Sequence, residues 1–521
     1  MSASKEKKIR KDQRTADWID PKAVQAEKER KDQKRTNIIF AVVAVLFVAI
    51  GIFSMTWNSG VMQKNSDAIS INGTTYSPST VQYYFVNSYN NFVNNNYYYL
   101  AYYGLTTGVS LKAQECFLLE EGTWHDYFVA QAATSMTNIR ALSERAAAAG
   151  LTWNDDMQKV YDAQIDSMEA ARVSYNELYG TKLDLEGYLK LVFGDLMTLK
   201  VYEAESKRLI LAQAYADAFV ETLNYSDSEL EEAYKADKNT YDRVSFQYLR
   251  ISGAAATTDA DGKTITPTDA DKAAAMAEAK ALAQDLAAKA QKGESFQDLS
   301  SANAKAALTS NEAGTYSDSV LMNWLFDAAR KDGEIAWLED AANSTYYVVK
   351  FNNRFRYDYN TVNVRHILVE LGTGSLTAED ANYGQQQELL KEMAWAEAES
   401  IYSTWRSGEA TEESFAALAN EHSRDTGSNT IGGLYEQVFR GQMVAEFNNW
   451  CFDETRQPGD TDVIYSEDTG YHVMYYVGED EPYWKIQVEE TLSDAAYSEW
   501  YAQQTEGYEC EILDFGMSAV G

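Results

Sequence analysis

An internal repeat constrains the fold of this chain more than any other feature of its sequence. Each copy reads as a strand, a long helix, an F-x-x-L-[AS] motif, a loop, a short helix and a closing strand. The short helices end in related motifs, N-W-L-F-D at 323–327 and N-W-C-F-D at 449–453. The copies span about 243–353 and 362–479, so the repeat predicts two α+β domains of one type.

The segment before the repeat is predicted to be mostly helical. Residues 65–80 read as a short strand and a turn, and from there to about residue 240 apolar residues recur at helical spacing. Within this region, the stretch from Tyr83 to Tyr103 is rich in Tyr and Asn. We favour a helix whose aromatic face packs in the core, and the alternative is an exposed adhesive surface for unfolded chains.

An apolar segment near the N-terminus predicts a membrane anchor. Residues 38–57 contain no charged side chain, and a helix of this length crosses a hydrocarbon core about 30 Å thick. Five Lys and Arg residues between 28 and 35 place the N-terminus in the cytoplasm and the main body outside. A cleaved signal peptide is the alternative, but the polar segment before the span is long for one. We therefore predict an uncleaved, single-pass anchor in the cell membrane.

Charge and missing motifs argue against several classes of function. The chain has 45 Lys and Arg against 79 Asp and Glu, a net charge of −34, and only residues 1–36 are basic. Such an acidic body repels phosphate backbones, so we expect no nucleic-acid binding, whereas cations of a cell wall or basic client proteins would be attracted. Motifs for zinc proteases, phosphate loops and C-x-x-C redox sites are absent, and we predict no metal and no cofactor. We expect Cys116, Cys451 and Cys510 to be three buried thiols, with one bridge as the alternative.

Several short motifs of the second copy follow one another in a specific order over about 115 residues. They are R-H-I-L-V at 365–369, F-x-x-L-A at 415–419, G-G-L at 432–434, R-G-Q-M at 440–443 and G-Y-H at 470–472. With these motifs, the second copy resembles the parvulin-type peptidyl-prolyl isomerases. The whole chain is similar to membrane-anchored foldases of the PrsA/SurA kind, in which a helical chaperone domain precedes or surrounds parvulin domains.

The resemblance implies an order of domains along the chain. A basic cytoplasmic tail and a transmembrane helix come first, then a helical chaperone-like domain, two parvulin-like domains of antiparallel sheet and helices, and a C-terminal helical segment that packs on the chaperone domain. The predicted bounds are 1–36 for the tail, 37–57 for the transmembrane helix, 58–240 for the chaperone-like domain, 241–356 for a degenerate parvulin-like domain, 360–480 for the isomerase domain and 481–521 for the last segment.

The implied reaction is rotation about X–Pro peptide bonds. The cis and trans forms differ little in energy, but a barrier of about 18–20 kcal/mol separates them. A catalyst needs an apolar pocket for the proline ring and polar groups around the rotating carbonyl, and it needs no cofactor because no bond is broken. By resemblance, the pocket is lined by Leu434, Met443 and Phe447, and the polar network consists of His366, Asp425, Thr469 and His472.

Each of these residues also has a plainer interpretation. Met443 and Phe447, placed four residues apart on one predicted helix face, would otherwise be ordinary core residues. The two histidines would be hydrogen-bonded core imidazoles, which orient the site rather than transfer protons. Asp425 stands where some parvulins carry Cys, so cysteine nucleophilic catalysis is excluded at this position, and alone it would be a loop or cap residue.

The sequence also departs from the family pattern. Between Gly433 and Arg440 the second copy is one residue longer than usual, and Val444 replaces a common Gln. The loop at 370–375 has no basic cluster, so recognition of phosphorylated Ser-Pro or Thr-Pro is not expected. In the first copy, Tyr248 and Tyr347 fall at the positions of the two histidines, which predicts a catalytically silent domain.

Together these features predict a membrane-anchored extracytoplasmic foldase. It would isomerise X–Pro bonds and bind unfolded or partly folded secreted polypeptides. A holdase chaperone whose parvulin folds are both scaffolds is the alternative, and a surface adhesin, suggested by the Tyr- and Asn-rich stretch, is less favoured.

Overall fold

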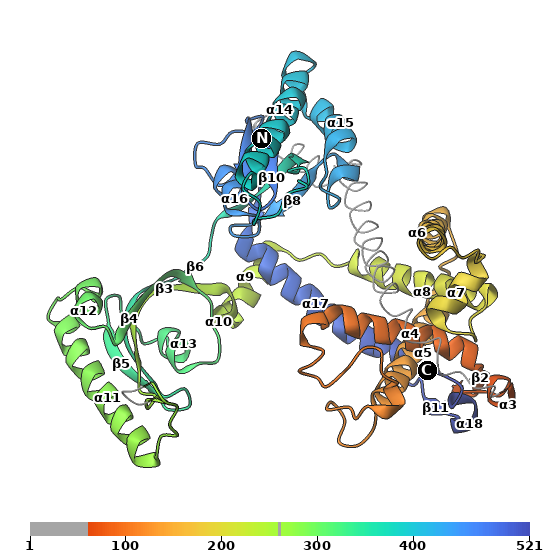
Figure 1. Ribbon diagram of the computed structural model, residues 1–521, viewed down its shortest axis with the longest axis horizontal. Coiled ribbons are helices and arrows are strands. Elements are labelled where there is room, and N and C mark those ends of the chain that lie inside the picture. The colour runs from red at the N-terminus through yellow and green to blue at the C-terminus, as the bar shows by residue number, and fades with distance from the viewer. Residues whose placement is uncertain (1–60, 259–261) are drawn as a thin grey trace, which may run out of the picture. The chain divides into compact units, whose positions relative to one another are not determined.

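The computed structural model describes residues 61–258 and 262–521 (Figure 1). These residues form two compact units. One unit contains the described residues up to Asn224 with Trp405–Leu434 and Ser493–Gly521, and the other contains Tyr225–Thr404 with Tyr435–Leu492. The predicted tail and anchor lie outside the described residues. No helix within the described ranges is both long enough and apolar enough to cross a membrane.

The first unit is mainly helical, as predicted for this region. Its larger helices are α4 (Pro78–Asn95), α5 (Trp124–Ala148), α6 (Asp155–Tyr179), α7 (Leu185–Phe193) and α8 (Leu199–Val220). Side-chain caps explain where four of them begin, because each of the residues Thr123, Asn154, Asp184 and Thr198 accepts a hydrogen bond from a backbone N–H of the first turn. Helix α4 packs on α5 and α8 around a large aromatic core.

The Tyr- and Asn-rich stretch divides into two parts. On α4, Tyr83, Tyr84 and Tyr89 are buried, as the favoured interpretation predicts. The hydroxyl of Tyr84 donates to Glu205, which also forms a buried ion pair of 2.7 Å with Arg140. Beyond the end of α4, Tyr97, Tyr98, Tyr99 and Tyr102 are exposed, and whether they bind unfolded chains stays a prediction.

The C-terminal residues return to the start of the described chain. Strand β11 (Cys510–Ile512) pairs antiparallel with β1 (Ile69–Ile71), which also pairs with β2 (Thr74–Tyr76). In the same unit, Trp500 of α17 (Tyr483–Thr505) stacks on Phe219 with ring centroids 4.7 Å apart. All three cysteines are free thiols, but Cys510 is exposed, which corrects the expectation of three buried thiols. Cys510 lies on β11, an edge strand of a small three-stranded sheet, where its side chain is exposed.

The second unit contains two four-stranded sheets, and the predicted repeat is confirmed by their common strand order. The first sheet has the order β4-β3-β6-β5 and the second β8-β7-β10-β9. The strands of the first are β3 (Asp242–Ser252), β4 (Ala306–Gly314), β5 (Ile335–Asp340) and β6 (Thr345–Arg356). The strands of the second are β7 (Asn360–Val369), β8 (Leu434–Val438), β9 (Thr461–Ser466) and β10 (Gly470–Pro482). The edge strands β4, β5, β8 and β9 were not expected from the sequence pattern, since each is exposed on one side and has weak apolar alternation.

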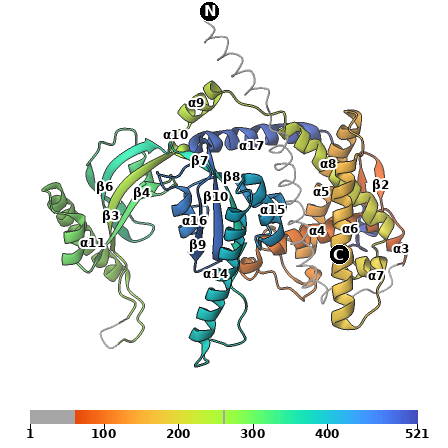
Figure 2. The same ribbon diagram turned by 90° about the horizontal axis from the view of Figure 1, so that it is seen from above.

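Helices cover both faces of the first sheet. The long helix α11 (Asp269–Gln291) packs on one face and α13 (Val320–Leu325) on the other (Figure 1). The second repeat has the same helix order, with α14 (Tyr383–Ser407), α15 (Glu412–His422) and α16 (Ala445–Cys451) (Figure 2). Helix α16 packs on the face of the sheet that carries the candidate site residues.

Candidate active site

Two buried imidazoles form the centre of the candidate site. His366 lies on β7 and His472 on the neighbouring antiparallel strand β10, where His366 pairs with Met474 and His472 with Leu368. A separation of two positions in this register directs both side chains to one face of the sheet. Their Nδ1 atoms are 3.1 Å apart, and the rings are stacked with centroids 5.3 Å apart. The sequence prediction that these side chains meet is therefore realised in the structure.

The hydrogen bonds around the imidazoles restrict where the protons can lie. Nε2 of His472 is 2.7 Å from the hydroxyl oxygen of Thr469. Because one Nδ1 must donate and the other must accept, the two rings cannot both be imidazolium. In one neutral arrangement, Thr469 donates to His472, which donates to His366. In the opposite neutral arrangement, His366 donates to His472, which donates to the Thr469 hydroxyl. The network thus has a fixed geometry, and the tautomers decide the direction of donation.

Aromatic and aliphatic side chains pack beside the imidazoles. Phe447 of α16 is buried and contacts both rings edge to face, at centroid distances of 5.3 Å from His366 and 5.5 Å from His472. The ring centroid of Tyr435, on β8, lies 5.4 Å from that of His366. Met443 is half-buried in the same apolar cluster as Phe447. This arrangement offers an apolar surface next to a polar pair, which is what a proline ring and its carbonyl require.

The predicted helix position of Met443 is wrong. Helix α16 begins at Ala445, with Val444 as its N-cap, so Met443 ends the preceding turn. Gly441 shapes this turn with a φ of 85°, and its N–H donates to Oδ1 of Asn448 at 2.7 Å. Because Met443 reaches the cluster from a turn rather than from the helix, its position depends on what holds that turn.

The extra residue predicted near the site coincides with an irregularity in β8. Gln437 has a φ of 53°, which is unusual for a residue other than glycine. Its N–H donates to the side chain of Asn363, at 2.8 Å. Tyr435, two residues before Gln437, still packs against the apolar cluster that contains Phe447.

The two other predicted site residues, Asp425 and Leu434, belong to the first unit, and their places relative to the imidazoles are not described. Asp425 lies in the loop after α15 and accepts hydrogen bonds from the backbone N–H of Gly427, at 3.0 Å, and from the hydroxyl of Ser428. Leu434 is the buried first residue of β8. The role of both residues in the site stays a prediction.

Two residues of the cluster escaped the sequence analysis. Tyr435 and Ile464 belong to the edge strands β8 and β9, and both pack against the buried cluster that contains Phe447. Neither residue falls in one of the motifs, so only the two-residue periodicity of these short strands could have indicated them.

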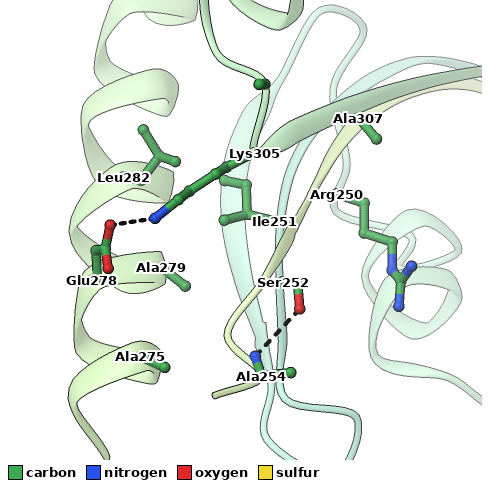
Figure 3. Close-up of a pocket in the computed structure, with 11 residues that line it drawn as sticks. Arg250, Ile251, Ser252, Ala254, Ala275, Glu278, Ala279, Leu282, Lys305 and Ala307 are labelled. Carbon is green, nitrogen blue, oxygen red and sulfur yellow. Dashed lines mark hydrogen bonds and ion pairs between the residues drawn. The ribbon is translucent and has the colours of Figure 1, made fainter. Parts of the chain in front are cut away.

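A separate hollow lies in the first repeat, away from the equivalent face. It has a volume of about 390 Å³ and opens between α11 and residues at the ends of β3 and β4 (Figure 3). Small side chains line much of it, and Lys305 forms an ion pair with Glu278 across one side. The lining also includes Arg250 but no aromatic ring and no histidine, so the hollow offers neither the apolar cluster nor the imidazole pair of the second repeat.

Comparison with known proteins identifies the second repeat. Residues 346–478 match the family model described as PPIC-type PPIASE domain, so the chain carries a parvulin-type peptidyl-prolyl isomerase domain. No match was found among curated proteins.

Several solved structures are similar to the chain. The peptidylprolyl isomerase PrsA from Bacillus anthracis is 21% identical, with 31% of this chain and 57% of that chain covered and a TM-score of 0.18. PrsA from Bacillus cereus is 13% identical over 76% of this chain and 90% of that chain, with a TM-score of 0.17. A SurA-like chaperone from Campylobacter jejuni is 14% identical over 70% of this chain and 89% of that chain, with a TM-score of 0.14. These TM-scores are low, and nothing further is drawn from the likenesses.

Proposed function

We propose that the parvulin-type domain of this chain catalyses cis/trans isomerisation of X–Pro bonds in polypeptides. The observation that carries this proposal is the juxtaposition of a half-buried Met443 and a buried Phe447 with the hydrogen-bonded pair of His366 and His472. The apolar side chains would hold the proline ring. The polar network would keep its geometry while the carbonyl rotates past it.

The physical basis of catalysis is the resonance of the amide. Planar X–Pro bonds gain resonance that separates charge between nitrogen and oxygen, and this resonance is lost when the bond twists. Removing water from around the bond therefore destabilises the planar form relative to the twisted one. Apolar contacts to the ring supply this environment and the orientation of the substrate. The imidazole pair acts by orientation and local polarity, since the reaction transfers no proton.

Exchange NMR on Ala-x-Pro peptides with the purified full chain tests the proposal. We expect acceleration of cis/trans exchange, and we expect it to fall by at least about tenfold in Met443→Ala and in His366→Ala. Tyr248→Phe is the matched control, because Tyr248 occupies the position of His366 in the first repeat. If the folded wild-type chain leaves the exchange rate unchanged, the isomerase function is wrong and a holdase becomes the better account.

We also propose that the helical unit binds unfolded polypeptides, and one surface feature supports this. A set of exposed aromatic and apolar side chains, here called the tyrosine lobe, lies between α4 and α5. Its members and their exposed fractions are Tyr97 61%, Tyr98 91%, Tyr99 64%, Tyr102 80%, Phe117 67% and Leu118 45%. Such an exposed group of large apolar side chains is typical of interaction surfaces.

The backbone that carries the tyrosine lobe is held by hydrogen bonds. The side chain of Gln114 accepts from the N–H of Thr106 and donates to the carbonyls of Thr106 and Val109, at 2.7 to 3.1 Å. An ordered loop that presents aromatic rings to solvent binds with less loss of entropy than a flexible one. Two acidic residues of the loop, Glu120 and Glu121, would favour clients that carry cationic side chains.

Suppression of aggregation of an unfolded client tests this second proposal. The double substitution of Tyr98 and Tyr102 by Ser should weaken suppression several-fold and leave peptide isomerisation unchanged. Tyr179→Ser is the control, because Tyr179 is 59% exposed at the end of α6. Equal loss in the control and in the double variant would contradict a specific role of the lobe.

Anchoring in a membrane and an extracytoplasmic location of the main body are also part of the proposal. They rest on the uncharged stretch 38–57 and the basic residues that precede it. The full chain should stay with membranes during alkaline extraction, and added protease should cleave its body from the outer side of intact cells. Release of the full chain by alkali would contradict the anchor.

A further inference from the structure

The turn that carries Met443 is in contact with residues just outside both ends of the predicted isomerase domain. Tyr359 directly precedes β7, and Tyr483 is the first residue of α17. The backbone N–H of Tyr483 donates to the carbonyl of Tyr359 at 2.9 Å, and the two rings are stacked with centroids 5.4 Å apart. The start and the end of the domain are thereby joined at one place.

This pair of tyrosines holds the turn 439–444. The backbone N–H of Arg440 donates to the hydroxyl oxygen of Tyr359 at 3.0 Å, and the Arg440 guanidinium lies 5.3 Å above the same ring. The ring of Phe439 stacks on Tyr483 with centroids 5.0 Å apart. Phe452, which follows α16, contacts both Arg440 and Tyr359. The first half of the turn is thus fastened to residues that no isomerase motif includes.

The second half of the turn leads directly to the candidate site. The backbone N–H of Gly441 donates a hydrogen bond to the side chain of Asn448 on α16, and Met443 follows two residues later. A shift of Arg440 would move this short segment as a whole, because only a few residues separate it from Met443. The contacts of Tyr359 therefore act on the place where the apolar surface meets the proline ring.

We infer that Tyr359 is a positioning residue of the isomerase site, whose hydroxyl and ring set the conformation of the turn 439–444 and through it the position of Met443. This inference rests on the proposed function of the second repeat. Burial raises the pKa of Tyr359 well above its ordinary value, so its hydroxyl stays neutral at physiological pH. The neutral oxygen accepts the Arg440 N–H, and the ring supports the guanidinium.

The first repeat provides a matched control. Tyr241 precedes β3 as Tyr359 precedes β7, but its ring is buried in a different cluster, with Leu230, Tyr234, Trp484 and Val488. The substitutions Tyr359→Phe and Tyr241→Phe each remove one hydroxyl and keep the ring. They differ in whether the hydroxyl accepts the Arg440 amide.

The experiment measures two quantities on the full chain with arginines labelled with ¹⁵N. The first is the hydrogen-exchange rate of the Arg440 amide, which does not require any isomerase activity. The second is isomerisation of an Ala-x-Pro peptide over a range of peptide concentrations. In Tyr359→Phe we expect Arg440 exchange to rise about fivefold and kcat/KM to fall about threefold to tenfold, mainly through KM. In Tyr241→Phe we expect both quantities to stay at the wild-type value.

Three results would overturn the inference. The first is unchanged Arg440 exchange in Tyr359→Phe, which would mean that the hydroxyl does not hold the turn. The second is faster exchange with unchanged kcat/KM, which would mean that the turn does not set the site. The third is an equal fall of activity in Tyr241→Phe, which would indicate a general effect. If the wild-type chain lacks activity, the proposed function fails, and the Arg440 exchange rate still decides whether Tyr359 holds the turn.

Discussion

At equivalent positions of the two sheets, the first repeat carries Tyr248 and Tyr347 and the second carries His366 and His472. The strand registers correspond, since Tyr248 pairs with Val349 as His366 pairs with Met474. The ring centroids are 5.4 Å apart in the tyrosine pair and 5.3 Å apart in the histidine pair. The backbone therefore holds a pair of rings at the same separation in both repeats.

The two pairs differ in orientation and in polarity. The tyrosine rings meet edge to face at 84°, whereas the imidazoles are nearly parallel at 19° with their Nδ1 atoms hydrogen-bonded. Edge-to-face packing suits two aromatic rings, and the nearly parallel arrangement brings two ring nitrogens within bonding distance. The comparison teaches that the same pair of sheet positions can carry either packed aromatic rings or a hydrogen-bonded polar pair.

The connections that lead into the first edge strand also differ in length between the repeats. Three residues, 303–305, connect α12 (Phe296–Ala302) to β4, whereas eleven, 423–433, connect α15 to β8. The longer loop contains Asp425, which has no counterpart in the first repeat. Where α16 places Phe447, α13 places Leu321. The first repeat thus has a shorter connection and no aromatic ring at the position of Phe447.

The largest loss of isomerase activity is expected when the two histidines of the second repeat are replaced by the tyrosines found at the equivalent positions of the first. The double substitution His366→Tyr and His472→Tyr should lower kcat/KM on a proline peptide by on the order of 100-fold, because the hydrogen-bonded imidazole network with Thr469, which orients the site, is lost. Exchange NMR measures this, with Tyr248→Phe as the control. Retention of half the wild-type rate would show that the imidazoles are only core residues.

A smaller loss is expected when the pocket ring is reduced to its counterpart in the first repeat. Phe447→Leu removes edge contacts to both imidazoles, each worth about 0.5–1.5 kcal/mol. We predict a fall in kcat/KM of about tenfold, measured on the same peptide. Leu321→Met in the first repeat is the matched control, and an equal loss in that variant would refute a specific role of Phe447.

Removing the hydroxyl of Thr469 tests which way the hydrogen bonds of the imidazole network run. Thr469→Val keeps the shape of the side chain and removes the partner of His472 Nε2, which should cost about 1 kcal/mol of stability and lower the isomerisation rate several-fold. The ¹⁵N chemical shifts of both imidazoles should change, because they report the tautomer. Unchanged shifts would mean that the Thr469 contact does not fix the protons.

Alkaline pH should destabilise the first repeat through Tyr347. Burial raises the pKa of Tyr347 above its ordinary value of 10.0. A raised folded-state pKa contributes stability that is present below pH 10 and lost as the pH rises above it, since the unfolded chain then releases the proton more readily. The free energy of unfolding, measured in urea at a series of pH values, should therefore fall above pH 10 in the wild type, and less so in Tyr347→Phe. An equal fall in both would exclude Tyr347 as the cause.

The smallest effect on isomerisation is expected at Cys451, where the first repeat has Leu325. Both side chains are buried, and Cys451→Leu enlarges the buried group, so it should lower the free energy of unfolding by about 1–3 kcal/mol and leave isomerisation unchanged. Burial also raises the pKa of the Cys451 thiol to about 12, so it should resist alkylation at neutral pH while the exposed Cys510 reacts. Mass spectrometry after brief alkylation distinguishes the two, and rapid labelling of Cys451 would contradict its burial.

Much of the architecture was predictable from the sequence by itself. The repeat predicted two similar α+β segments, and helical periodicity predicted the helical region before them. The motifs of the second copy predicted the imidazole pair and its neighbours, because conserving a family's chemistry requires certain residue types at certain spacings. These features depend on the periodicity of apolar residues and on the residue types at motif positions, both of which can be read from the sequence.

Only the tertiary structure decided the details on which the site depends. In the structure, Met443 lies in a turn rather than in a helix, and Tyr435 and Ile464 pack against the apolar cluster. Tyr359 and Tyr483 contact that turn. The structure also divided the Tyr-rich stretch into a buried part and the exposed tyrosine lobe. These contacts join residues that are distant in the sequence, and they depend on where edge strands and turns pack, which no local pattern encodes.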